Sequence, residues 1–130
     1  MPFTLATWNI NSVRLREPIV CKLLAEEGPD VLCLQECKSP VDKIPRDGFA
    51  AIGYPHMVAR GDKGYNGVAI LSKFPIEDVV RGLPGDPEDE QARWIEATIN
   101  TVRVCGLYLP NGNPVDSPKF PYKLGWMQRM

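Results

Sequence analysis

The sequence predicts an α/β fold, and three consecutive segments carry that prediction. Residues 3–10 (FTLATWNI) have strand composition, residues 14–27 place apolar side chains at helical spacing, and residues 30–36 (DVLCLQE) form an apolar run typical of a strand covered on both faces. A strand, a helix and a second strand in this order favour parallel pairing through a right-handed crossover. We therefore expect one mixed sheet with a covering helix.

The helix has clear boundaries. Its apolar face is formed by Ile19, Val20, Leu23 and Leu24, and Gly28-Pro29 should end it. Pro18 should lie in the first turn, where the missing N–H costs little.

The remaining segments follow the usual turn and strand signals. We expect a loop over 38–45, one or two extended segments over 48–60, a glycine-rich turn over 61–67 and a strand over 68–73, after which 76–83 could extend the sheet. We further expect an exposed acidic loop over 82–92, an antiparallel hairpin of 93–99 with 102–109, an irregular proline-rich stretch over 110–121 and a helix over 123–130.

Composition excludes several protein classes. With 44% hydrophobic and 24% charged residues, the 130-residue chain has the composition of an ordinary globular domain and not of a disordered or fibrous protein. No apolar run approaches the roughly 18 residues of a membrane span, and no secretory signal is present, so we expect a cytoplasmic protein. The net charge of -1 gives no overall attraction to nucleic acid, although a local basic patch could supply one. Without a Cys-x-x-Cys pair, the apolar surroundings of Cys21, Cys33 and Cys105 predict buried, reduced thiols.

Several polar residues lie where strands should end. Glu36 follows the strand of 30–36 at the edge where open α/β sheets place their chemistry, but an acidic strand end taken alone indicates only a solvated side chain. Asn9 and Asn11 could simply cap a turn, and Tyr108 and Asn111 fit a strand end followed by a turn. These residues gain significance only as a set.

Four short motifs in the order TWNINSVR, LQECK, KGYNGVAIL and YLPNG resemble the exonuclease III family of DNA repair nucleases, which includes AP endonucleases and belongs to the endonuclease/exonuclease/phosphatase superfamily. The resemblance implies a four-layer αββα sandwich, of which this chain would be the N-terminal half. It also implies an enzyme that uses Mg²⁺, or alternatively Mn²⁺, to hydrolyse phosphodiesters of double-stranded DNA at abasic sites and 3′ ends.

The resemblance also assigns roles to individual residues. Glu36 matches the metal ligand, and Asn9 matches a position beside the metal, with both a ligating and a catalytic role. Tyr108 matches a tyrosine near the scissile phosphate, where a phenol can donate a hydrogen bond, and Asn111 matches a neighbouring polar position. Contacts to the DNA backbone are expected from Arg14, Lys38, Tyr65, Asn66 and Asn11.

The Gly-Asp-x-Asn and Ser-Asp-His motifs of the family's second half do not occur in this sequence. We therefore expect residues 1–130 to be a single incomplete domain, the N-terminal part of a longer enzyme and inactive alone. An uncovered apolar sheet face would make it self-associate. Two alternatives remain: a non-catalytic DNA-binding or self-associating module, and a phospholipid-directed relative, against which the KGYNG and YLPNG motifs speak.

Overall fold

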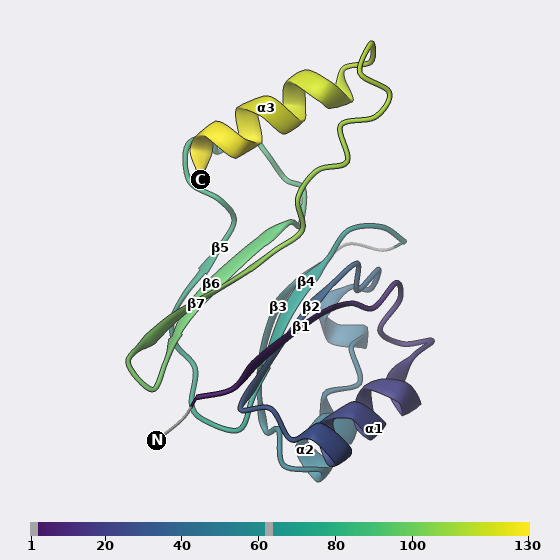
Figure 1. Cartoon of the computed structure of the whole chain (residues 1–130), viewed down its shortest axis with the longest axis vertical. Helices are drawn as coiled ribbons and strands as arrows, with labels where there is room; N and C mark the ends of the chain where they lie inside the picture. The colour runs from purple at the N-terminus through teal and green to yellow at the C-terminus, as the bar shows by residue number, and fades with distance from the viewer. Residues whose placement is uncertain (1–2, 62–63) are drawn as a thin grey trace.

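The structure, a computed structural model, describes residues 3–61 and 64–130, in which seven strands form two sheets (Figure 1). The elements in chain order are β1 (Leu5–Asn9), α1 (Glu17–Glu27), β2 (Val31–Gln35), the 3₁₀ turn η1 (Val41–Lys43), α2 (Arg46–Ala51), β3 (His56–Arg60), β4 (Val68–Ser72), β5 (Glu77–Arg81), β6 (Trp94–Ile99), β7 (Val102–Leu107) and α3 (Lys119–Arg129).

The first sheet has the strand order β1-β2-β4-β3. β1 and β2 are parallel, with Asn9 opposite Gln35, and the other two pairs are antiparallel. The four apolar residues of β2, Val31 to Leu34, are all buried because both faces of this sheet are covered. The predicted parallel pair is thus confirmed, and it brings the ends of β1 and β2 to the same edge.

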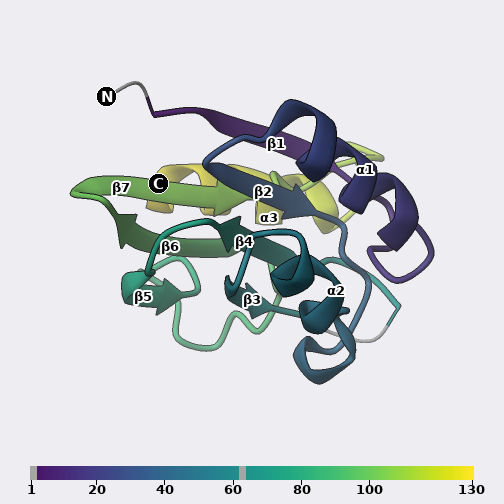
Figure 2. The ribbon, with the colours of Figure 1, turned by 90° about the horizontal axis from the view of Figure 1, so that it is seen from below.

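α1 packs on the outer face of this sheet. Pro18 lies in its first turn. Gly28 ends the helix in a left-handed conformation, and the Gly28 N–H donates to the Leu24 carbonyl at 3.1 Å. Val20 and Leu24 are buried against β2 and β4, together with Phe49 of α2. Figure 2 shows α1 and α2 on the same side of the first sheet.

The expectation of a single mixed sheet is wrong in one respect, because β5, β6 and β7 form a second, antiparallel sheet. β4 is already paired on both edges, with β2 and β3, so β5 cannot join the sheet beside it. The second sheet instead packs face to face with the first, and its Ile95, Ala97 and Ile99 contact the layer that contains Val31 and Ile70. The sheet face that we expected to be open is therefore covered.

Three smaller expectations are also corrected. Residues 46–51 are helical and not extended, because burial of Phe49 against α1 and the first sheet favours the compact turn. Cys105 is exposed, since it lies on the outward face of β7. The loop over 82–92 is mostly exposed as predicted, but Leu83 and Ala92 are buried.

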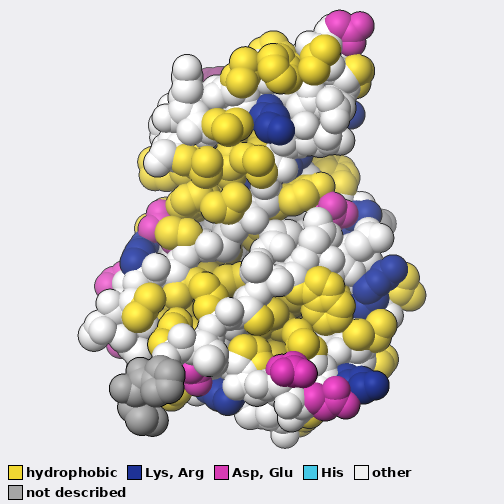
Figure 3. Space-filling model, in the orientation of Figure 1, with side chains coloured by type: hydrophobic (Ala, Val, Ile, Leu, Met, Phe, Trp, Pro, Cys, Tyr) yellow, Lys and Arg dark blue, Asp and Glu magenta, His cyan; other side chains and the backbone are white. Residues whose placement is uncertain are grey.

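α3 lies beyond the end of the second sheet, over the loop between β5 and β6 (Figure 1). It starts at Lys119, earlier than predicted, and is anchored by Trp126, whose ring meets that of Trp94 edge to face with centroids 6.1 Å apart. Its outer side chains Leu124 and Met127 are exposed, as is Met130 directly after the helix. Figure 3 shows hydrophobic side chains gathered at this end of the molecule. None of the helices in the described residues is long and apolar enough to cross a membrane.

Candidate functional site

Glu36 directly follows β2, at the edge where β1 and β2 end together. The loop after β1 is bonded to the loop after β2: the amides of Ser12 and Val13 donate to the carbonyls of Glu36 and Cys37 at 2.8 and 3.0 Å. The parallel pairing therefore continues past the strands and fixes the backbone that carries the Glu36 carboxylate.

Three of the four sequence motifs meet at this carboxylate. Asn9 Nδ2 donates to Glu36 Oε1 at 2.9 Å, and Tyr108 Oη donates to the same oxygen at 2.8 Å. Lys38 Nζ lies 3.5 Å from the other oxygen, Oε2. The structure thus brings together four residues that the sequence predicted for the site.

These contacts determine the charges in the site. The hydrogen bond from Asn9 holds the pKa of Glu36 below its ordinary value, against the effect of partial burial, with further help from Tyr108 and Lys38. Partial burial and the neighbouring Glu36 carboxylate raise the pKa of Tyr108. At neutral pH the site therefore presents an anionic carboxylate beside a phenol that can donate.

Lys38 and Arg16 form the basic side of the site, and both donate hydrogen bonds to Asn11. Lys38 Nζ donates to Asn11 Oδ1 at 2.6 Å, and Arg16 Nη1 donates to the Asn11 carbonyl, also at 2.6 Å. Arg16 was missed by sequence reasoning, which treated it only as part of the predicted helix. Arg14 is exposed on the same segment, but in the described part of the chain no hydrogen bond joins it to this group.

The loops around Glu36 contain an unusual number of left-handed residues other than glycine. Their φ angles are 49° at Asn11, 85° at Ser12, 53° at Glu36, 52° at Lys38 and 56° at Asn66. Such conformations are costly for residues with a side chain and concentrate at functional sites. Here they aim several polar side chains at one place.

The glycine-rich turn packs directly on the loop after β2. The Lys38 amide donates to the Asn66 carbonyl at 2.9 Å, and the Cys37 amide donates to the Gly67 carbonyl at 3.2 Å. Gly67 has φ 101°, and a Cβ there would lie 3.1 Å from the Cys37 Cβ, so only glycine allows this close approach. The predicted turn also includes Asp62 and Lys63, which lie outside the described residues.

Tyr65, Asn66 and Asn111 lie beside the Glu36 group and not in it. They line a hollow of about 460 Å³, together with Arg93, Lys119 and Tyr122 among others. The Asn111 Oδ1 accepts a hydrogen bond from Asn113 Nδ2 at 3.1 Å. Asn111 therefore lines this hollow, whereas Tyr108, which was predicted to lie in the same site, contacts Glu36 directly.

Arg93 and Tyr122 are further residues that sequence reasoning did not assign. The Arg93 guanidinium carbon lies 4.9 Å from the centre of the Tyr108 ring. The predicted hairpin contained a signal for this contact, because Arg93 precedes β6, Tyr108 follows β7, and their neighbours Trp94 and Leu107 are paired.

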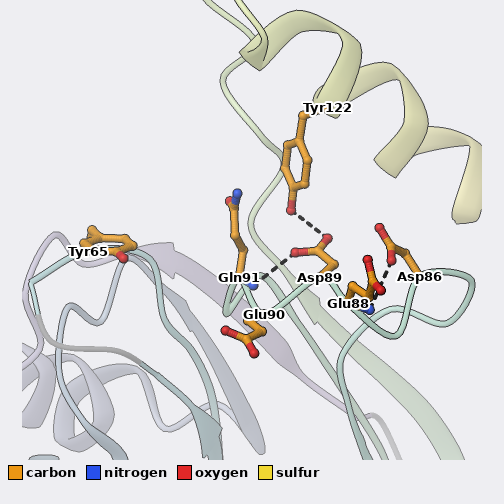
Figure 4. Close-up of a pocket in the computed structure, with 7 residues that line it drawn as sticks. All are labelled: Tyr65, Asp86, Glu88, Asp89, Glu90, Gln91 and Tyr122. Atoms are coloured by element: carbon orange, nitrogen blue, oxygen red, sulfur yellow. Dashed lines mark hydrogen bonds between the residues drawn. The ribbon is translucent and has the colours of Figure 1, made fainter.

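A second hollow, of about 700 Å³, has acidic walls (Figure 4). It is lined by Tyr65, Asp86, Glu88, Asp89, Glu90, Gln91 and Tyr122. Asp89 points toward α3 and accepts a hydrogen bond from Tyr122 Oη at 2.8 Å. The grouped carboxylates make this side of the molecule unfavourable for a phosphate backbone.

The donor set suits some metal ions better than others. Within residues 3–61 and 64–130, no group of three or more His, Cys, Asp or Glu side chains could hold a metal ion, as a structural zinc site requires. Glu36 is a single ionised carboxylate beside the amide of Asn9. This combination fits a hard cation such as Mg²⁺, which keeps several waters and needs only one or two protein carboxylates.

The sequence and the fold both match known nucleases. Residues 6–130 match the model of the endonuclease/exonuclease/phosphatase family. An exodeoxyribonuclease III from Haemophilus influenzae is 35% identical over 122 residues, which are 90% of this chain and 45% of that protein.

Two solved structures have the same fold over 98% of this chain, and each is 46% identical to it in sequence. One is a 3′ phosphatase from Neisseria bound to a product DNA hairpin, with a TM-score of 0.95. The other is an AP endonuclease from Archaeoglobus fulgidus, with a TM-score of 0.93. The chain covers 49% of each of these structures, so it spans about half the length of the relatives it matches. The family match over almost the whole chain and the superposable fold confirm the resemblance that the four motifs predicted, and the chain belongs to the endonuclease/exonuclease/phosphatase family.

Proposed function

We propose that this chain carries the N-terminal part, a single incomplete domain, of a DNA repair nuclease of the exonuclease III type. Such an enzyme hydrolyses phosphodiesters of double-stranded DNA at abasic sites and at 3′ ends. The observation that carries the proposal is the convergence of Asn9 and Tyr108 on one oxygen of Glu36, at 2.9 and 2.8 Å. Strand pairing accounts for the two strand ends lying at one edge, but it does not require side chains 27 and 72 positions away to donate to the same carboxylate oxygen.

Each residue of the site has a role in this proposal. Glu36 would hold Mg²⁺, or Mn²⁺, and Asn9 would orient the carboxylate or ligate the ion through its own Oδ1. A bound divalent cation would neutralise the charge that develops on the phosphoryl group. Tyr108 would donate its phenolic hydrogen to a phosphate oxygen, for which its raised pKa keeps it protonated. Asn111 would assist from the wall of the neighbouring hollow.

The basic and amide side chains around this centre would hold the DNA backbone without reading sequence. Lys38 and Asn11 are already linked to each other beside Glu36. Tyr65 is 62% exposed at the mouth of the neighbouring hollow, with Asn66 behind it. Arg14 would reach the DNA from the exposed segment before α1. A DNA substrate and free cysteines both favour the cytoplasm as the location.

The test is cleavage of abasic duplex DNA with Mg²⁺ by the complete natural protein. Glu36→Gln keeps the size of the side chain but removes its charge, so we expect the rate to fall by about a hundredfold or more. Glu26→Gln, on the exposed face of α1, is the matched control and should retain full activity. An unchanged rate for Glu36→Gln would refute the assignment of the metal ligand.

A non-catalytic module that binds DNA or a second copy of itself is the alternative. The exposed side chains Leu124 and Met127 on α3, with Met130 just after it, favour self-association of the 130-residue chain through that helix. Sedimentation of the chain, compared with a Leu124→Lys variant, tests this. A module would bind duplex DNA in a mobility-shift assay without cleaving it, and Glu36→Gln would leave its binding unchanged.

A further inference from the structure

Arg93 is packed against the candidate catalytic tyrosine by three separate contacts. Its guanidinium carbon lies 4.9 Å from the centre of the Tyr108 ring. Its Nη1 donates to the Tyr108 carbonyl at 3.3 Å, and its own carbonyl accepts from the Tyr108 amide at 2.8 Å. Both the ring and the backbone of Tyr108 are therefore held by one residue.

The other side of Arg93 is held from α3. Its guanidinium carbon lies 6.0 Å from the centre of the Tyr122 ring, so the charge is close to two aromatic rings. Its Nε donates to Gln91 Oε1 at 2.7 Å. Arg93 thus connects the second sheet, the acidic loop and α3 at the edge of the site.

Asp89 holds α3 in place through hydrogen bonds to Tyr122 and Arg129. Its Oδ2 accepts hydrogen bonds from Tyr122 Oη and Arg129 Nη1, both at 2.8 Å, and its Oδ1 accepts from the Gln91 amide at 3.0 Å. The side chains of Asp89 and Arg129 are only 6% and 16% exposed. Loss of an exposed surface contact would disturb α3 little, whereas removal of one partner of a pair this buried leaves an uncompensated charge under the helix.

We propose that Arg93 is a positioning residue that holds the phenol of Tyr108 at the Glu36 carboxylate. Arg93 in turn contacts Tyr122 of α3, whose hydroxyl is bonded to Asp89 in the loop between β5 and β6. As far as catalysis is concerned, the inference rests on the proposed nuclease function. A displacement of about 1 Å at a catalytic group can cost about a hundredfold in rate, so a contact outside the reacting atoms can have a large effect.

A direct contact of Arg93 with a DNA phosphate would be a different role, and kinetics separate the two. A phosphate contact acts on substrate binding and would raise KM. A positioning role acts on the group that works in the transition state and would lower kcat. It also requires Tyr108 to be present, whereas a phosphate contact does not.

The kinetic test uses the complete natural protein with abasic duplex DNA. We expect Arg93→Met to lower kcat by about ten- to a hundredfold with KM changed less than about twofold. Arg93→Lys keeps the charge but not the planar stack, so it should restore only part of the rate. Arg103→Met removes an arginine of the same sheet that bonds Glu96 and Asp78 instead, and it should leave both constants unchanged.

The same substitution is then made in a Tyr108→Phe background. A positioning role predicts that Arg93→Met costs less than about twofold there, because the hydroxyl that it positions is gone. An equal loss in both backgrounds, or a rise in KM with kcat unchanged, would overturn the inference.

A second measurement does not depend on nuclease activity. With ¹³C-labelled tyrosine, the ring signals of Tyr108 at a fixed neutral pH should shift and broaden in Arg93→Met and stay in place in Arg103→Met. Unmoved Tyr108 signals would overturn the inference even in an active enzyme. Shifted signals in a protein without nuclease activity would support the positioning and refute the proposed function. If Arg93→Met fails to fold, Arg93→Lys is judged by the same signals.

Discussion

The two sides of the candidate site are built from different interactions. On one side, Asn9 ends β1 and Glu36 follows β2, and β2 is buried between α1 and α2 on one face and the second sheet on the other. On the opposite side, Tyr108 follows β7 at the end of the smaller sheet, where Arg93 and the Asp89 network hold it. The first side depends mainly on apolar packing, and the second adds charges and hydrogen bonds to the apolar contacts of Tyr108 and Trp126.

This difference predicts how each side responds to a change of conditions. Apolar burial does not depend on protonation, so the strands that carry Glu36 and Asn9 should keep their backbone geometry over a wide pH range. A network around one carboxylate depends on that group being ionised. The Tyr108 side is therefore the part of the site that acid or a single lost hydrogen bond should loosen first.

The largest loss of stability is expected on the Glu36 side. Leu34→Ala removes a fully buried side chain from β2 and should lower the free energy of unfolding by about 4 kcal/mol, because the transfer term and the cavity term add. Leu5→Ala, on an exposed position of β1, should change it by less than about 0.5 kcal/mol. Urea denaturation followed by circular dichroism measures both. Equal effects would show that β2 is not the firm support described above.

The second largest loss of stability is expected on the Tyr108 side. Asp89→Asn leaves Arg129 without its buried partner and should cost about 3 kcal/mol. Glu96→Gln breaks the more exposed pair with Arg103 and should cost less than about 1 kcal/mol in the same urea experiment. If the two variants are equally stable, α3 is not held by Asp89.

The two sides should differ most clearly in acid. Burial alone would raise the pKa of Asp89, but hydrogen bonds from Arg129, Gln91 and Tyr122 outweigh it and hold the pKa below its ordinary value. For a carboxyl with a depressed folded pKa, the stabilisation is complete above the unfolded pKa of about 3.9 and is lost as the pH falls through the folded pKa.

The stability difference between the natural protein and Asp89→Asn should therefore shrink as the pH falls from 7 to about 2.5, whereas the difference for Leu34→Ala should stay constant. Unfolding curves at several pH values measure both differences. A difference for Asp89→Asn that does not depend on pH would contradict the role of its charge.

The smallest effect is expected from a single hydroxyl. Tyr122→Phe keeps the ring beside Arg93 but removes the hydrogen bond to Asp89, at a cost of about 1.5 kcal/mol for a bond to a charged group. In an Asp89→Asn background the same change should cost less, because the two residues share that bond. Additive losses would show that Tyr122 and Asp89 act independently.

Local patterns were sufficient to predict the fold of the Glu36 side, whereas the roles of Glu36 and Asn9 came from the resemblance to the family. The strand, helix and strand of residues 3–36 are adjacent in the chain, and the apolar run of β2 indicated that both its faces are covered. Parallel pairing then placed Glu36 and Asn9 at one edge. The hairpin of β6 and β7 was predicted for the same reason, because its strands are separated only by Asn100 and Thr101.

The second sheet and the stack around Arg93 required long-range information. Alternation along β6 shows that one face is buried, but it does not show whether that face belongs to the first sheet or to another that packs on it. The contact of Arg93 with Tyr122 depends on where α3 packs on the rest of the molecule. That position is set by contacts of Trp126 and Asp89, two residues far apart in the chain that no local sequence pattern connects. The role of Asp89 could not be distinguished from those of its acidic neighbours by sequence.

The left-handed backbone around Glu36 sets a limit on how stable this protein can become. At φ 53° a glycine would be relaxed, whereas any residue with a Cβ is strained by about 1 kcal/mol. Selection for heat resistance alone would therefore favour Glu36→Gly over Glu36→Ala, and would erase the carboxylate at the same time. Stability and the proposed activity therefore favour different residues at this position.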